Sequence, residues 1–189
     1  MQRQIALIPG DDAQAKIMVS WKGGLLSELV KSMVTDDDPN EEAPAEIPTP
    51  DANKVVLEQI ARFLNYHADD PMKEITKPIP SNNLYELVGK WDADFINEFQ
   101  EHESLFRIIL GANYLDIPPL LELGICKLAC MIKGKEPDEV KRMFKIEDIT
   151  PEEEKVVREQ NAWIFDVSTL VARTAPVTVG GGGEEEEEG

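Results

Sequence analysis

The chain has 189 residues, of which 42% are apolar, and a formal net charge of −18. An acidic excess of this size repels phosphate backbones and anionic membranes, so direct binding to nucleic acid or to a membrane surface is not expected. No apolar run approaches the roughly 20 residues that a bilayer span needs, and the N-terminus lacks the long apolar stretch of a signal peptide. We therefore expect a soluble protein of the cytoplasm and nucleus, with one domain and an appendage.

Two acidic runs supply much of this charge. Residues 36–46 hold six carboxylates, and residues 184–188 hold five glutamates. Without these eleven charges the net charge of −18 becomes −7, which is ordinary for a globular surface. The first run contains prolines and few apolar residues, so it predicts a mobile loop. The glycine and glutamate tail is of low complexity and is expected to be disordered.

The N-terminal part predicts a small α/β unit. Apolar residues alternate over residues 5–7 and again over residues 17–19, a pattern typical of a β-hairpin. Gly23-Gly24 is expected to break the chain before a helix over residues 26–34. Ile47-Pro48 predicts a short edge strand, because proline cannot donate a hydrogen bond within a central ladder.

Helices dominate after this point. One is predicted from a cap at Asp51 to about His67. Its inward stripe consists of Val56, Ile60, Phe63 and Leu64. Residues 68–82 hold three prolines and predict a loop, which a short helical turn follows over residues 83–90. The next helix opens near Trp91.

The segment from Leu105 to Trp163 carries more apolar surface than its short helices can bury on themselves. A cap at Ser104 opens the first helix, which ends at Asn113-Tyr114. A cap at Asp116 opens the second, where two prolines are tolerated in the first turn because its amides lack intrahelical partners. Gly134 then stops that helix.

Two more helices complete this segment. One begins at Pro137 and has apolar residues on one side. The other begins with Thr150-Pro151-Glu152-Glu153, which predicts a capping box with proline in the first position. Each is only about ten residues long, too short to be stable alone. From the pattern alone, they either complete the core or form a groove for a partner.

The residues give little support to an enzyme. Cys126 and Cys130 share a helix face, but a zinc site needs about four ligands, so we expect reduced thiols that pack as small hydrophobes. His67 and His102 are predicted to be surface or capping residues. No phosphate loop, metal cluster or nucleophile–base pair is recognisable, so no cofactor is expected.

Four stretches resemble one family, the S-phase kinase-associated protein 1 adaptors, which link F-box proteins to a cullin in ubiquitin ligases. They are residues 91–95, 113–117, 131–135 and 152–163. The resemblance implies an α+β fold. It consists of a BTB/POZ-like domain with a small sheet and helices, followed by two C-terminal helices that form an F-box-binding groove.

The same resemblance implies an organisation into three parts. Residues 1–115 would form the BTB/POZ-like domain with its acidic loop, and residues 116–163 the helical F-box-binding region. Residues 164–189 would be a divergent extension that ends in the acidic tail, because family members usually stop soon after the final tryptophan.

Carried over residue by residue, the resemblance implies two binding sites. Asn113 and Tyr114 would contact a cullin. The F-box contacts would be Ile125, Leu128, Ile132, Val140, Phe144, Asn161 and Trp163, with Trp163 as the anchor. The implied function is a non-catalytic adaptor that promotes ubiquitination of recruited substrates. The free protein would self-associate weakly, if at all.

The chain also departs from the family pattern. Glu136 stands where a threonine cap is usual, which weakens the start of a helix by about 1 kcal/mol, and Pro119 replaces a common glycine. Pro151 resembles a proline that some protist relatives hydroxylate and then glycosylate; the simpler interpretation is that it starts its helix.

Three alternatives remain open from the sequence. An elongin-C-like adaptor would share the fold but lack the two terminal helices. An F-box-binding scaffold outside a ligase, of the kinetochore type, would use the same groove. An acidic chaperone of basic proteins would use Glu184–Glu188, and its binding would be sensitive to salt.

Overall fold

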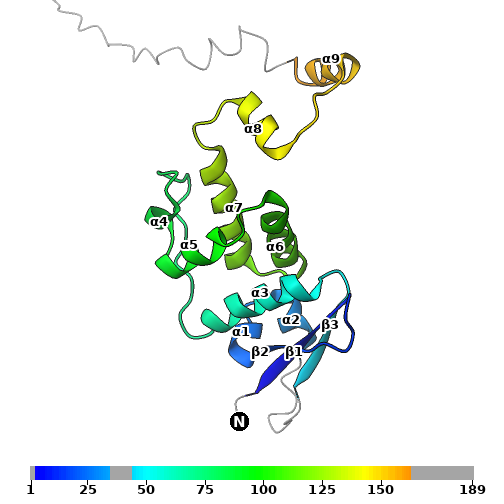
Figure 1. The fold of residues 1–189 in the computed structure, drawn as a ribbon, viewed down its shortest axis with the longest axis vertical. Helices are drawn as coiled ribbons and strands as arrows, with labels where there is room; N and C mark the ends of the chain where they lie inside the picture. Colours follow the sequence, from blue (N-terminus) through cyan, green and yellow to red (C-terminus); the bar gives the residue numbers. More distant parts are fainter. Residues whose placement is uncertain (1–2, 35–43, 163–189) are drawn as a thin grey trace, which may run out of the picture. The chain divides into compact units, whose positions relative to one another are not determined.

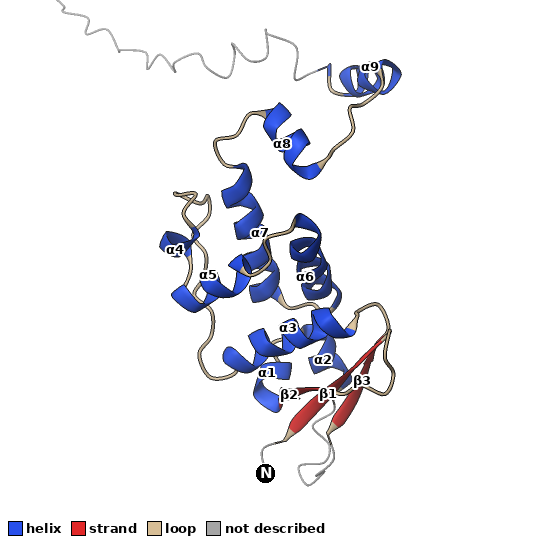
Figure 2. Cartoon of the chain, viewed as in Figure 1, coloured by secondary structure: helices blue, strands red, loops and turns tan. Residues whose placement is uncertain are grey.

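The computed structural model describes residues 3–34 and 44–162. The chain divides into two compact units, one ending at Val140 and the other beginning at Lys141. The described residues form a small sheet and a set of helices (Figures 1 and 2), which confirms the α+β class. None of the helices in the described ranges is long and apolar enough to cross a membrane.

The sheet has β1 (Gln4–Pro9) at its centre, between β2 (Ile17–Ser20) and β3 (Ala45–Thr49). β1 is antiparallel to β2, with Ile5 opposite Val19, and parallel to β3. The predicted hairpin and the predicted edge strand are therefore both confirmed. The acidic run over residues 36–46 lies mostly outside the described residues.

The helices are α1 (Trp21–Gly24), α2 (Glu28–Met33), α3 (Lys54–Tyr66), α4 (Leu84–Leu87), α5 (Lys90–Asn97), α6 (His102–Tyr114), α7 (Pro118–Ile132), α8 (Pro137–Phe144) and α9 (Pro151–Gln160). In the first unit, α3 packs against the sheet and against α6, and α6 packs against α7 (Figure 1). The inward stripe predicted for α3 is buried throughout. The core continues from it into α5, α6 and α7.

The predicted caps of α3 and α6 are wrong by two or three residues. α3 begins after Asn53, whose side-chain oxygen accepts a hydrogen bond from the Val56 amide at 2.9 Å, and not after Asp51. α6 begins after Glu101, and Ser104 lies in its first turn, where its hydroxyl donates to the Glu101 carbonyl at 2.7 Å. Several polar residues precede each helix, and only the packing of the finished helix selects one of them.

One further expectation needs correction. Gly23-Gly24 does not break the chain but lies buried in α1. A Cβ on Gly23 would lie 2.5 Å from the Leu64 carbonyl oxygen, so only glycine permits this contact between α1 and α3. His67 caps the C-terminus of α3, which is one of the two roles predicted for it, and it is buried.

The cysteines pack as the sequence predicts. Cys126 is buried in the core and Cys130 is half-buried, and both are free thiols. Burial, with a further contribution from the neighbouring Cys130, raises the pKa of the Cys126 thiol to about 11. Cys126 is therefore protonated at neutral pH and has the low reactivity of a structural thiol.

The turn between α6 and α7 is attached to α2. The prediction that Asp116 caps α7 is wrong. Asp116 has a φ of 49°, and Ile117 occupies the cap position. The Asp116 carbonyl accepts a hydrogen bond from the Glu28 amide at 2.9 Å. The fully buried Ser27 hydroxyl donates to the Leu115 carbonyl at 2.5 Å and accepts from the Val30 amide at 3.1 Å. Ser27 thus caps α2 and holds the turn with one hydroxyl group.

We predict that Ser27→Ala lowers the free energy of unfolding by about 1–3 kcal/mol, because it removes an N-cap and leaves a buried carbonyl without its donor. Urea denaturation followed by circular dichroism measures the change. Ser32→Ala is the matched control on the same helix, where the exposed hydroxyl donates only to Leu29 of its own turn. Equal effects of the two substitutions would contradict the role assigned to Ser27.

Candidate functional site

The outer side of α6 presents one exposed surface. Leu110 is 66% exposed and Phe106 38% exposed, and Asn113 and the half-buried Tyr114 both follow about one turn after Leu110. We call these four residues the α6 face. They recur at i, i+4, i+7 and i+8, opposite the buried stripe of the same helix.

A hollow of about 420 Å³ lies between the C-terminal half of α6 and the start of α3. Asn113 and Tyr114 both line it, together with Leu110. A Cβ on Gly111 would lie 2.7 Å from Cγ1 of Val56, so the glycine lets α3 and α6 approach closely at the hollow. The structure thus brings the two predicted cullin contacts together on one concave surface.

A second exposed surface lies on α7. Ile125 is 52% exposed and Ile132 41% exposed, and Leu128 between them is half-buried. We call these three residues the α7 face. The opposite side of α7 enters the core through Leu120, Leu123, Gly124 and Cys126. Gly124 packs directly on α6, where a Cβ would lie 2.5 Å from Cγ1 of Ile109, and this contact directs the α7 face away from the core.

The remaining predicted F-box contacts lie on α8 and near α9. Val140 and Phe144 are one helical turn apart on α8, and both are half-buried. Asn161 is half-buried at the C-terminus of α9, where its side-chain amide donates to the Val157 carbonyl at 2.8 Å. Trp163, the predicted anchor, lies outside the described residues, as does the extension over residues 164–189.

α9 begins with the predicted capping box. The Thr150 hydroxyl accepts from the Glu153 amide at 3.3 Å, and the Glu153 carboxylate accepts from the Thr150 amide at 2.8 Å. The Thr150 amide and the Thr150 hydroxyl both donate to the Glu153 carboxylate, and these two hydrogen bonds hold the pKa of Glu153 below its ordinary value of 4.5. Pro151 occupies the first position of the helix and is exposed. Its modification stays a prediction.

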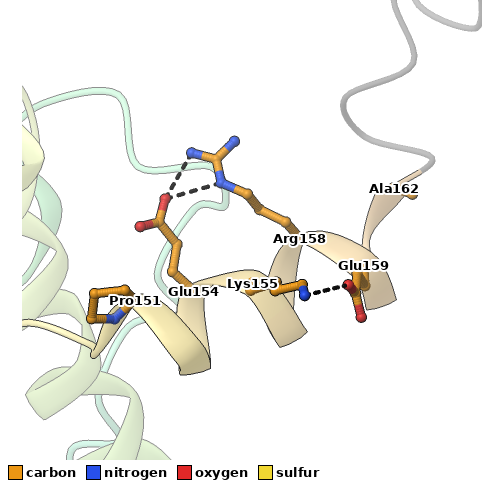
Figure 3. Close-up of a pocket in the computed structure, with 6 residues that line it drawn as sticks. All are labelled: Pro151, Glu154, Lys155, Arg158, Glu159 and Ala162. Carbon is orange, nitrogen blue, oxygen red and sulfur yellow. Dashed lines mark hydrogen bonds and ion pairs between the residues drawn. The ribbon is translucent and has the colours of Figure 1, made fainter.

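One flank of α9 carries acidic and basic side chains that pair with one another (Figure 3). Arg158 donates to Glu154 at 2.7 and 3.0 Å, and Lys155 lies 3.9 Å from Glu159. These i, i+4 pairs stabilise a short helix by a few tenths of a kcal/mol each. The apolar residues Val156 and Val157, 50% and 48% exposed, lie on other sides of the helix.

The start of α8 compensates in part for the missing threonine cap. Glu136 replaces that cap, and its backbone amide donates instead to the Glu139 carboxylate at 3.1 Å. This is the return half of a capping box, which satisfies one of the amides that the helix leaves unpaired.

Comparison with known proteins assigns the family. A model described as "Skp1 family, dimerisation domain" matches residues 118–164, which run from the start of α7 to just beyond α9. The S-phase kinase-associated protein 1 homolog of Tetrahymena thermophila is 44% identical over 144 residues, 76% of this chain and 84% of that protein. The chain belongs to the Skp1 family. The resemblance seen in the sequence is therefore confirmed, and the small sheet with its helices is the BTB/POZ-like architecture of Skp1 proteins.

Fungal relatives carry a more specific description. The "E3 ubiquitin ligase complex SCF subunit sconC" of Arthroderma otae is 40% identical over 141 residues, 74% of this chain and 82% of that protein. The protein of the same description from Talaromyces stipitatus is 36% identical over 167 residues, 88% of this chain and 99% of that protein. This Skp1 family member thus resembles subunits of a ligase along most of its length.

Sequence reasoning missed part of the α6 face. Phe106 and Leu110 were not singled out, although the signal was present. Both are large apolar residues that fall between the inward positions Leu105, Ile108 and Ala112. Single exposed apolar residues are normal, but several that adjoin one another and are bordered by polar residues indicate a binding surface.

We predict that Thr150→Ala destabilises the first turn of α9 by about 1 kcal/mol. Hydrogen exchange of the Glu153 and Glu154 amides measures the loss, with Thr76→Ala in an exposed loop as the control. Because the folded pKa of Glu153 is depressed, its contribution is present above pH 4.5 and is lost as the pH falls below that value. Unchanged exchange in Thr150→Ala would contradict the capping role.

Proposed function

We propose that this protein is a non-catalytic adaptor of an SCF-type E3 ubiquitin ligase. One of its surfaces binds an F-box protein and another binds a cullin, so that substrates of the F-box protein are brought to the ligase and ubiquitinated. The observation that carries the proposal is the pair of exposed faces on consecutive helices, α6 and α7, joined by a turn that α2 holds. The naming of relatives as SCF subunits supports it.

The α6 face suits the cullin. It combines an exposed leucine, an aromatic ring and an amide around a hollow of about 420 Å³, and protein interfaces are typically enriched in such aromatic anchors with polar groups at the rim. Asn113 and Tyr114 are the residues proposed to contact the cullin, and Phe106 and Leu110 extend the surface.

The α7 face suits the F-box. Its residues Ile125 and Ile132 are exposed, and the half-buried Leu128 joins them into an apolar strip. Val140, Phe144, Asn161 and Trp163 are proposed to add further contacts. A helical partner segment buries such a strip through residues spaced three and four apart.

An adaptor of this kind needs no catalytic group. It raises the local concentration of substrate near the ligase by holding two partners at once, and the gain comes from geometry and not from chemistry. A scaffold outside a ligase would bind an F-box through the α7 face but would not need the α6 face, so the two faces must be tested separately.

The F-box proposal predicts that Trp163→Ala weakens binding of an F-box fragment by roughly 2 kcal/mol or more, and Ile132→Ala by about 1 kcal/mol. A binding titration by calorimetry measures both. Val55→Ala is the matched control, because Val55 is 67% exposed on α3 and lies off the α7 face. Binding by the wild type that neither substitution weakens would place the F-box elsewhere.

The cullin proposal predicts that Leu110→Ala and Tyr114→Ala each reduce binding of the cullin N-terminal domain by about tenfold, since each removes a side chain from the hollow. F-box affinity should stay at the wild-type value in both variants. Tyr85→Ala is the control, because Tyr85 is a 53% exposed tyrosine on α4. If the cullin does not bind the wild-type protein with an F-box present, the scaffold alternative is favoured.

A further inference from the structure

Residues 68–82 form an ordered segment that runs from the end of α3 along α7; we call it the strap. Ile75 of the strap is 4% exposed within the core, and Met72 and Ile79 pack against that core. Lys77 lies 2.6 Å from the Glu122 carboxylate of α7, and Lys133 at the end of α7 donates to the Ile79 carbonyl at 2.6 Å. The strap therefore braces the helix that carries the α7 face.

The strap is fastened at its start by His67. Nδ1 of the ring lies 2.6 Å from the Asp70 carbonyl oxygen, and Nε2 lies 2.8 Å from Oδ1 of Asp92 on α5. Both partners can only accept hydrogen bonds. A neutral imidazole has one N–H and satisfies one of them, whereas an imidazolium has two and satisfies both. The observed geometry thus matches the charged ring.

The surroundings of the His67 ring explain why its protonation state affects the hydrogen bonds of the folded protein. His67 is 4% exposed and Asp92 5% exposed. The rings of Phe63, Tyr66 and Trp91 lie 4.5, 5.0 and 5.4 Å from the imidazole, centroid to centroid, and shield it from water.

The charged groups that face the ring are the carboxylates of Asp92 from α5 and Asp70 from the strap. The neighbouring Asp69, which precedes Asp70 in the strap, forms an ion pair with Lys22 of α1 at 2.5 Å. Burial by itself lowers the pKa of His67, but the hydrogen bonds with Asp92 and Asp70 outweigh it and raise the pKa above the ordinary value of 6.5.

We propose that His67 is a pH-sensitive positioning residue, which fastens the strap fully only as an imidazolium and through the strap steadies α7. Below pH 6.5 the ring is charged in both the folded and the unfolded state, and the folded state alone gains the two hydrogen bonds. This stabilisation is lost as the pH rises through the higher folded pKa. Above it, one ring nitrogen has no proton to donate, and either the strap or α5 loses its bond to His67.

Hydrogen exchange of the full-length protein, corrected for intrinsic rates, tests this fastening from pH 6 to pH 8.5. We expect opening of the strap amides to increase by about threefold or more across this range in the wild type. In His67→Gln the profile should be flat, because glutamine does not titrate. His102→Gln is the matched control, since it removes the other histidine of the chain and should keep the wild-type profile.

A second measurement on the wild type keeps the proposal testable if His67→Gln fails to fold. Nitrogen chemical shifts of the His67 ring report its protonation directly, and we expect both nitrogens to be protonated at pH 6. A neutral ring at pH 6 overturns the proposal. So does strap opening that is independent of pH in the wild type, or that depends on pH equally in His67→Gln.

The consequence for α7 rests on the proposed function. F-box affinity of the wild type should fall by about threefold between pH 6.5 and pH 8.5, and that of His67→Gln should not change with pH. If the strap loosens but the affinity stays constant, the coupling to α7 is wrong. If no F-box fragment binds at any pH, the proposed function fails, while the exchange result on the strap stands by itself.

Discussion

The structure of the first unit depends on the hydrogen bonds that join α2 to the turn between α6 and α7. Ser27 reaches Leu115 and Glu28 reaches Asp116, across 88 residues of sequence. Because α6 and α7 each carry one of the two proposed binding faces, the angle between the faces is set at this turn. An adaptor acts by holding its two partners in a fixed relative position. A flexible turn would therefore leave both faces intact and still impair the adaptor function. Gly111 and Gly124 add to this constraint by allowing close packing of α6 against α3 and α7.

The parts of the fold that the sequence predicted are those decided by neighbouring residues. The capping box at Thr150, the stop after α7 at Gly134 and the edge strand with Pro48 all follow from local chemistry. The wrong predictions share a different cause. Asp116 looked like a cap for α7 but has a left-handed backbone just after the end of α6, and its carbonyl is bonded to α2, 88 residues away. The capping role of His67 was among those predicted, but its burial was not, because its partner Asp92 lies 25 positions away.

The same division holds for the candidate site. The exposure of Ile125 and Ile132 could be expected from the family resemblance, and the helical period explains it in the structure. Leu110 could have been found from its period on α6, but only the packing of α3 shows that it borders a hollow. The sequence predicts residues 68–82 only as a loop, because they have no periodicity and are ordered by contacts with His67 and α7. A local sequence pattern does not show which residues far away in the chain will contact a segment.

Each edge of the sheet has a feature that hinders the addition of a further strand. On β2, the side chain of Asn65 from α3 accepts from the Ser20 amide at 2.7 Å and donates to the Met18 carbonyl at 3.3 Å, where a neighbouring strand would otherwise bond. On β3, Pro48 removes a donor from the ladder. Open edges invite aggregation and the addition of extended peptides. An adaptor gains nothing from capturing unfolded chains, and Asn65 and Pro48 reduce the number of free hydrogen-bonding groups that the two edges offer to them.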